Sequence, residues 1–483
     1  MGYKLINLIS ITWLLVTCAV SANSYKQPLQ PLKEPKRIYL PTAAERQLGR
    51  EFIEEVRKYY AILSDDITNH YLQTLGYRLV SNSNLANRPF RFFMVIDNSI
   101  NAFAGPDAQI GINSGAIIKL NSENELAAIM AHEIAHVTQH HLEQIITRAK
   151  ETQTIATACT IASVLLGIAT GSGDLVSGTA MATMGGTTQH LINFTRTHEV
   201  EADNVGMKIL FKSGFDPHSM QQVFTTMQRA HLDYANEIPP FLLTHPLSED
   251  RIATTKNHAD RYPKVITTAT DITFELVKAR LKVITNSKYR KPADNLSLKN
   301  QNKINSLTKA QQAAALYEQA LVLYQNNKYQ AALEIITKLY DQYPNEPILL
   351  ILKANLAWAT NQQAAAISML EQGLAKHPSY LPLILQYASI LIANQNYQPA
   401  SNYLKNQILK YPNLAKLYLM LAKAQSANNQ LAAAYQSQAE AYILMDNQPK
   451  ALLLLQQALK TSNLTKAERE IITARVERIK KAN

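Results

Sequence analysis

The sequence predicts a mainly α-helical protein in two parts: an α+β domain with a small sheet beside an amphipathic helix, followed by a C-terminal α-solenoid. Two observations support this fold class. Small residues recur every 34 residues through the C-terminal third of the chain, which is typical of stacked helical repeats. Ahead of that region, short β-like segments precede a capped helical pattern, which indicates a small sheet packed against a helix.

Residues 1–22 are expected to form an export signal. Lys4 supplies the positive charge, residues 5–20 form a mainly apolar stretch, and Val20-Ser21-Ala22 fits the small-residue cleavage pattern. An uncleaved membrane anchor is the alternative. Cleavage would leave Cys159 as the only cysteine, so neither an internal disulfide nor a cysteine-based metal site is expected.

Residues 42–284 are predicted to form the α+β domain. Helical patterning runs from Thr42 to Val80, and β-like runs follow at 90–96, 102–104 and 109–112. Ser122-Glu123-Asn124-Glu125 then predicts the capping box of a helix whose apolar residues lie on one side.

An uncharged segment, residues 152–173, follows that helix. Its length is nominally enough to span a bilayer, but its many Thr and Gly residues argue against a spanning helix. We expect a mobile helical or loop segment beside the site, with peripheral membrane contact. A membrane-embedded protein that uses this segment as a span is the alternative.

Residues 285–306 are rich in Asn, Ser, Lys and Pro, and are predicted to be a linker to a repeat domain at 307–483. Three series of residues share the 34-residue spacing, and two of them consist of alanine. The series are Pro344, Pro378 and Pro412; Ala320, Ala354, Ala388 and Ala422; and Ala332, Ala366, Ala400 and Ala434. Small residues at close helix contacts and a proline after the second helix resemble the tetratricopeptide repeat. Four repeats are readable, and the last helices are expected to cap the array.

Composition excludes several classes of protein. Apolar residues make up 47% of the chain and charged residues 18%, so wholesale disorder is excluded. The formal net charge is +11, but Lys and Arg are spread along the chain without a long basic block. We therefore expect no nucleic-acid partner.

His132-Glu133-Ile134-Ala135-His136 fits the H-E-x-x-H pattern. On a helix the two histidines lie on one face, about 6 Å apart along the axis, so both can reach one Zn²⁺. Glu133 is placed to accept a proton from water. The spacing therefore predicts a site for one zinc ion per chain, with Glu133 beside it.

A second acidic pattern, Glu199-Val200-Glu201-Ala202-Asp203, lies downstream. Glu199 and Asp203 are four residues apart and share a helix face. One of them can bind the metal while the other holds a ligating imidazole by a hydrogen bond. A solvated acidic face is the alternative reading of this pattern.

H-E-x-x-H followed by E-x-E-A-D resembles the zinc peptidases of the HtpX and CAAX-prenyl-protease type. Together with an export signal and a repeat array, the chain resembles the β-barrel assembly-enhancing proteases of the Gram-negative periplasm. The resemblance implies His132, His136 and Glu199 as zinc ligands. It implies Glu133 as the catalytic base and Asp203 as a catalytic residue that acts behind a ligand.

Leu243-Thr244-His245-Pro246 and the nearby Arg251 also resemble that family. The resemblance implies His245 as a resting-state zinc ligand that leaves for catalysis. Arg251 would then steady a carboxylate or the oxyanion of the reacting substrate. Two alternatives for His245 stay open: an oxyanion-stabilising donor, and a loop histidine with a structural bond.

The remaining histidines are expected to have lesser roles. His140 and His141 are predicted to follow H-E-x-x-H on the same helix, with His140 in solvent or behind a ligand. His198 is expected to serve in packing. Cys159 is interpreted as a small buried hydrophobic residue.

The predicted function is that of a periplasmic zinc endopeptidase with a repeat docking domain, which acts in quality control and assembly of outer-membrane proteins. Its substrates would be misfolded or stalled outer-membrane proteins, and its repeats would bind the outer-membrane assembly machinery. The alternative is chiefly a repeat-based chaperone or docking protein whose metal site is mostly silent.

Overall fold

The computed structural model describes residues 42–145, 188–233, 245, 248–265, 272–286, 307–462 and 464–482. The predicted export signal, the uncharged segment 152–173 and most of the predicted linker lie outside the described residues. Across these described ranges, no helix is long and apolar enough to cross a membrane.

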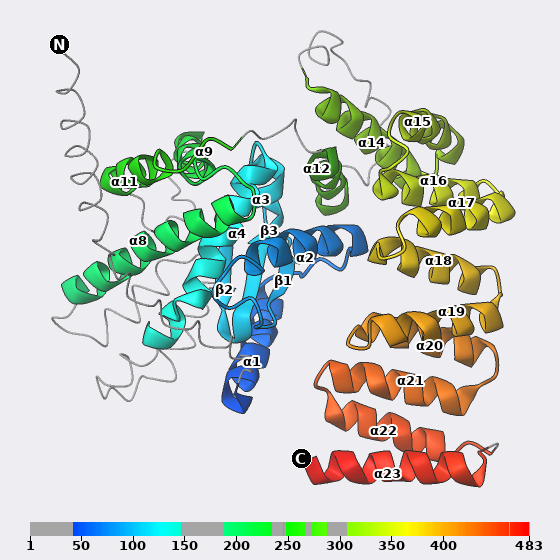
Figure 1. Cartoon of the computed structure of the whole chain (residues 1–483). Coiled ribbons are helices and arrows are strands. Elements are labelled where there is room, and N and C mark those ends of the chain that lie inside the picture. The colour runs from blue at the N-terminus through cyan, green and yellow to red at the C-terminus, as the bar shows by residue number, and fades with distance from the viewer. Residues whose placement is uncertain are drawn as a thin grey trace, which may run out of the picture. The chain divides into compact units, whose positions relative to one another are not determined.

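Helices dominate the structure, and a small three-stranded sheet lies beside the helix that carries H-E-x-x-H (Figure 1). The predicted fold class is thus confirmed. The elements before the repeats are, in chain order, α1 (Ala43–Tyr59), α2 (Asp66–Val80), β1 (Arg91–Val95), β2 (Ala102–Gly105), β3 (Gln109–Asn113), α3 (Ser114–Lys119), α4 (Glu123–Thr138), α8 (Thr188–Lys212), α9 (Ser219–Asp233), α11 (Glu249–Ala259) and α12 (Ile272–Thr285).

The helical pattern at Thr42–Val80 forms two helices rather than one. The Thr42 side chain accepts a hydrogen bond from the Glu45 backbone, and the Glu45 carboxylate accepts one from the Thr42 backbone, so a full capping box starts α1. Tyr60 is extended and ends that helix, and the Asp65 carboxylate caps the start of α2. Hydrophobic periodicity alone did not reveal the break between them.

The sheet has the strand order β1-β3-β2, with β1 parallel and β2 antiparallel to the central β3. All three predicted β-like runs are strands. Between β2 and β3 the chain turns through Asp107 and Ala108, whose φ angles are +58° and +52°. Because β2 pairs only with β3 in the described sheet, it is an edge strand there. It packs against α4.

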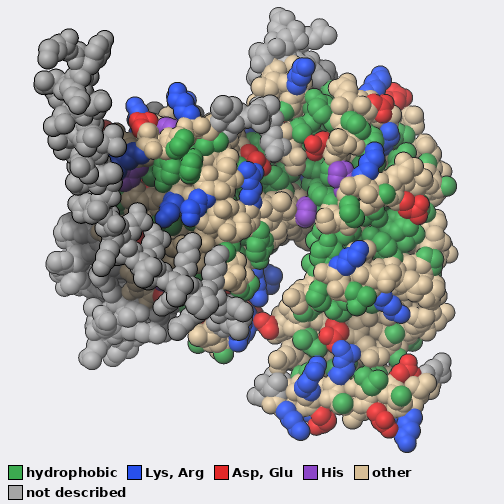
Figure 2. Space-filling model, viewed as in Figure 1, with side chains coloured by type: hydrophobic (Ala, Val, Ile, Leu, Met, Phe, Trp, Pro, Cys, Tyr) green, Lys and Arg blue, Asp and Glu red, His purple; other side chains and the backbone are tan. Residues whose placement is uncertain are grey.

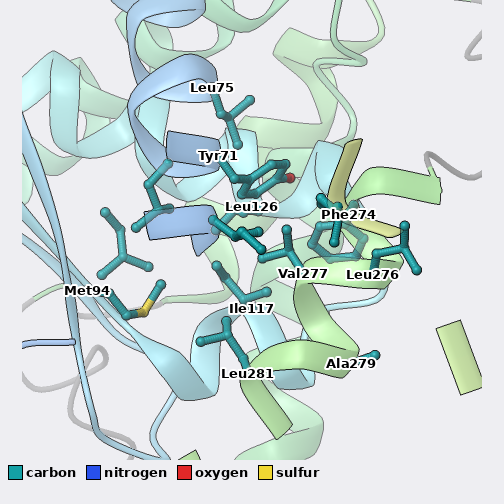
Figure 3. Packing of buried hydrophobic residues seen from close by; sticks show 14 of the residues in the cluster. Tyr71, Leu75, Met94, Ile117, Leu126, Phe274, Leu276, Val277, Ala279 and Leu281 are labelled. Atoms are coloured by element: carbon teal, nitrogen blue, oxygen red, sulfur yellow. The ribbon is translucent and has the colours of Figure 1, made fainter. Parts of the chain in front are cut away.

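The core of the α+β part lies between α2, the sheet, α3, α4 and α12 (Figure 3). Its buried side chains are aliphatic or aromatic and come from segments far apart in the sequence. They include Tyr71, Leu75, Met94, Ile117, Leu126, Phe274, Val277 and Leu281. Because α4 contributes its apolar residues to this core, the backbone that carries H-E-x-x-H is held rigidly.

The repeat domain consists of eight helices in four pairs, followed by two further helices (Figure 1). The pairs are α14 (Lys309–Gln325) with α15 (Tyr329–Gln342), α16 (Pro347–Ala359) with α17 (Gln363–Lys376), α18 (Leu381–Ala393) with α19 (Tyr397–Lys410), and α20 (Ala415–Ala427) with α21 (Leu431–Leu444). The last two are α22 (Gln448–Leu459) and α23 (Lys466–Ala482). All eight alanines of the two predicted series are buried, as close helix contact requires.

The turns inside the repeats show a second periodic feature that sequence reasoning missed. The residue that links the two helices of each pair adopts a left-handed conformation, with φ between +59° and +61°. These residues are Asn327, Asn361, Gln395 and Asn429. Asparagine tolerates this conformation better than most residues, which explains its recurrence at three of the four turns.

The apolar core of the α+β part continues into the first repeats. α12 packs against α14, and Arg280 of α12 forms a two-bonded ion pair with Asp65, at 2.6 and 2.9 Å. The same guanidinium donates to the Tyr317 hydroxyl of α14 at 3.3 Å. The predicted boundary at 285–306 therefore follows α12 but does not separate two independent apolar cores.

Candidate metal centre

Helix α4 begins where the sequence predicts. The Ser122 hydroxyl accepts a hydrogen bond from the Glu125 backbone, which is half of the predicted capping box. The Glu125 carboxylate instead accepts from the backbone of Asn121. The helix then runs to Thr138 with nearly every side chain buried, so His132 and Glu133 face an interior and not solvent.

Helix α8 crosses α4 closely and brings the second acidic pattern to the first. At Gly206 of α8 an added Cβ would lie 3.3 Å from the Ala131 carbonyl oxygen and from the His132 nitrogen. A side chain at this position would push the two helices apart. The glycine thus allows Asp203 and Glu199, about one and two turns earlier on α8, to reach the histidines.

Four of the predicted residues converge on one point: His132, His136, Glu199 and His245. Each offers a nitrogen or oxygen atom, and the four atoms lie within 4.8 Å of one another. The His132 and His136 Nε2 atoms are 3.0 Å apart, and the His245 Nδ1 atom lies 3.0 Å from the Glu199 carboxylate. Glu199 Oε1 lies 3.4 Å from the His136 Nε2 atom.

These separations fit a tetrahedral cation site. Zinc bonds of about 2.0–2.1 Å to nitrogen or oxygen place neighbouring ligand atoms about 3.3–3.4 Å apart on the edges of a tetrahedron. The donor set of imidazole and carboxylate also suits Zn²⁺. The residues present therefore fit the predicted ion in both chemistry and spacing.

Asp203 lies behind the cluster rather than in it. Its Oδ1 atom is 3.0 Å from the His132 Nδ1 atom, so the carboxylate holds that ring from the side away from the four donors. Burial alone would lower the pKa of His132, but Asp203 and Glu199 raise it to about 10. Metal binding must therefore displace a proton from this ring.

Arg251 of α11 is buried between the same two carboxylates. Its guanidinium forms a two-bonded pair with Asp203 at 2.7 and 2.9 Å and lies 2.8 Å from Glu199. Burial alone would raise the pKa of Glu199, but His245 and Arg251 hold it well below its usual range. Steadying carboxylates was one of the two roles expected of Arg251, and its role toward an oxyanion stays a prediction.

Glu133 is buried beside the cluster, and its Oε1 atom lies 3.6 Å from the His245 Nε2 atom. Burial raises the pKa of its carboxyl, while the backbone N–H of Ala104 in β2 opposes this shift. A carboxyl with a raised pKa next to a metal site suits a group that takes up and returns a proton.

The prediction that His140 and His141 continue the helix of H-E-x-x-H is wrong. α4 ends at Thr138, and His140 has a φ of +58°. This left-handed residue turns the chain, so the buried His141 contacts His136 at 2.9 Å, which sequence reasoning missed. Five residues apart, these histidines would lie on different faces of a continuous helix.

Glu201 and His198 lie around His141. Glu201 contacts the His141 Nε2 atom at 3.3 Å and does not belong to the four-donor cluster, and His198 stacks on the His141 ring. The expected packing role of His198 agrees with this stacking.

Comparison with known proteins gives the family. The sequence pattern of peptidase family M48 matches residues 66–259, and that of the tetratricopeptide repeat matches 323–379. The β-barrel assembly-enhancing protease of Yersinia pestis is 30% identical over 351 residues, which are 71% of this chain and 70% of that protein. The chain belongs to the β-barrel assembly-enhancing protease family.

Other members of the β-barrel assembly-enhancing protease family are similar over shorter spans. The putative member from Vibrio cholerae is 36% identical over 62% of this chain and 61% of its own length. The Escherichia coli protein is 32% identical over 66% of this chain and 63% of its own length. The chain thus spans slightly less than two thirds of these two relatives.

Proposed function

We propose that this chain is a zinc-dependent endopeptidase, with His132, His136 and Glu199 as metal ligands and Glu133 as the base. The convergence of four donor atoms within 4.8 Å carries the proposal. Membership of a family of named proteases and the match to peptidase family M48 support it.

A bound zinc ion would polarise the scissile carbonyl and lower the pKa of its water to about 7. Glu133 then accepts a proton from the attacking water and passes it to the leaving amine. Its burial favours both halves of this transfer, because a raised carboxyl pKa brings the group closer to the working pH. Asp203 keeps the His132 ring in a fixed orientation throughout, and Arg251 keeps Asp203 in place.

The edge strand β2 is suited to hold an extended substrate. It lies next to α4, and its Ala104 N–H is directed at Glu133. A peptide that adds to this edge through main-chain hydrogen bonds would pass beside the base with little dependence on sequence. Such loose specificity suits the degradation of misfolded proteins.

The repeats supply the second part of the proposal, a docking surface for protein partners. We propose that they bind the outer-membrane assembly machinery, and that the substrates are misfolded or stalled outer-membrane proteins in the periplasm. The names of the relatives and the predicted export signal support this assignment. On the face shown in Figure 2, Lys and Arg side chains lie scattered among acidic and apolar ones.

His245 is proposed to close the site at rest. It supplies the fourth donor atom of the cluster and also approaches Glu133, so it occupies the place that a water molecule needs. Peptide hydrolysis would require its departure.

One experiment tests the proposed activity. The purified wild-type chain should contain about one zinc ion and digest casein, whereas Glu133→Gln should keep the zinc and lose the digestion. Substantial digestion by zinc-loaded Glu133→Gln would refute the role of this base. Zinc-loaded wild type and zinc-loaded His245→Ala that both digest nothing would instead favour a docking protein with a silent site.

A further inference from the structure

The buried His141 occupies the far side of a proposed zinc ligand. Its Nδ1 atom lies 2.9 Å from the Nδ1 atom of His136, on the side of that ring opposite the four-donor cluster. The side chain of His141 is 2% exposed. The left-handed conformation of His140 is what returns the chain to this position after α4 ends.

The hydrogen-bond direction follows from the atoms involved. His136 presents Nε2 to the cluster, so as a metal ligand its hydrogen must be on Nδ1. The facing Nδ1 atom of His141 must then accept that hydrogen. The hydrogen of His141 consequently resides on Nε2, where the Glu201 carboxylate lies 3.3 Å away.

The His141 ring is held in this orientation by a stacked imidazole. His198 stacks on it with ring centres 4.1 Å apart and planes 8° from parallel. The Nε2 atom of His198 lies 3.2 Å from the side-chain oxygen of Gln144, which fixes the stacked ring in turn. Two elements therefore meet at His141: α8, which carries Glu201 and His198, and the helical turn after α4.

We propose that His141 and Glu201 form a positioning relay that orients His136 for metal binding, and this inference rests on the proposed role of His136 as a zinc ligand. The two metal-binding histidines of α4 would then be held by different sets of hydrogen-bond partners. His132 contacts the carboxylate of Asp203 directly, whereas His136 reaches the carboxylate of Glu201 through a second imidazole. Both sets of partners fix the tautomer and the ring orientation of a ligand.

The test is zinc affinity of the purified chain, measured by competition with a chromophoric chelator, together with the absorption spectrum of the Co²⁺ form. His141→Phe keeps an aromatic ring for the stack but removes the acceptor. It should weaken zinc binding by roughly 10–100-fold, which is typical of losing a partner behind a metal ligand. His141→Asn places an amide oxygen near the same position and should stay within about threefold of wild type.

A matched control and a surface variant complete the series. His140→Asn alters the neighbouring histidine, whose side chain is 44% exposed, and keeps a residue that tolerates positive φ, so its affinity should be unchanged. Glu201→Ala removes a side chain that is 47% exposed, so it leaves the fold intact. It should weaken zinc binding, by less than His141→Phe, because the acceptor on His141 stays in place.

The outcomes separate the two proposals. A wild-type chain with no zinc site would overturn the proposed function and the relay together. Tight zinc binding by wild type, with equal affinity in His141→Phe, would overturn the relay alone. His141→Asn as weak as His141→Phe would show a packing role instead of an acceptor. If His141→Phe does not fold, Glu201→Ala decides, and unchanged affinity in that variant also overturns the relay.

Discussion

Replacing Arg251 tests how the buried carboxylates of the site are held. In Arg251→Met the apolar stem stays, but the guanidinium that bonds Asp203 at 2.7 and 2.9 Å and Glu199 at 2.8 Å is lost. Both acids are almost fully buried, so neither can recover its lost partner from water.

These contacts set the expected loss of unfolding free energy in Arg251→Met. Removing one partner of a buried ion pair costs roughly 3–5 kcal/mol, because an uncompensated charge remains inside the protein. The protonated His132 still faces Asp203 when no metal is bound, so we expect the lower end, about 3 kcal/mol. Zinc places a positive charge beside Glu199, so the loss of unfolding free energy in Arg251→Met should be smaller when zinc is bound.

The assay is urea unfolding followed by far-ultraviolet circular dichroism, with a chelator and again with zinc. Arg251→Lys is the matched control. It keeps the charge but lacks the planar fork that forms the two-bonded pair with Asp203, so its stability should lie between wild type and Arg251→Met. A chelated Arg251→Met protein that unfolds at the wild-type urea concentration would refute the reasoning.

Three further predictions concern other parts of the chain. His136→Ala and Glu199→Ala should each lose zinc, since each removes one of three proposed permanent ligands, and a fully zinc-loaded Glu199→Ala protein would contradict this ligand set. His245→Ala should keep zinc and digest casein faster than wild type. A fully zinc-loaded His245→Ala protein whose rate of casein digestion falls by roughly 10²–10³-fold would instead identify His245 as an oxyanion donor. Burial alone would raise the pKa of Asp65, but the hydrogen bond and charge of Arg280 keep it below the usual value. This carboxylate therefore stabilises the fold above its unfolded pKa, and the contribution is lost as the pH falls through the folded one. Asp65→Asn should lower the free energy of unfolding at pH 7 by about 2 kcal/mol and by progressively less in acid. A loss of stability that does not change with pH would contradict this role of the Asp65 carboxylate.

Patterns of short range were readable from the sequence because they depend on local geometry. The 34-residue spacing specified where two helices touch, and alanines such as Ala354 and Ala400 are fully buried there. The same holds for His132 and His136, because a four-residue spacing places both on one face of a helix whatever surrounds it. The start of α4 at Ser122 followed from capping chemistry.

Contacts between distant segments were decided by the tertiary structure. The resemblance to known peptidases suggested His245 as a ligand. Only the fold brings it next to His132, which lies 113 residues earlier in the chain. Gly206 lets α8 approach α4, and no sequence pattern marks that close contact. The continuation of the apolar core from α12 into α14 likewise has no counterpart in the linker-like composition of 285–306.

His141 shows the physical reason most clearly. Helical periodicity assigns it to a face away from His136, and that reasoning is sound as long as the helix continues. The helix ends at Thr138, and the φ of +58° at His140 turns the chain so that His141 contacts His136. Histidine adopts such an angle more often than most residues, but it is also common inside helices, so its presence in the sequence does not mark the break. The sequence by itself therefore determined the helices and their faces, and the packing of α8 against α4 decided which side chains meet between them.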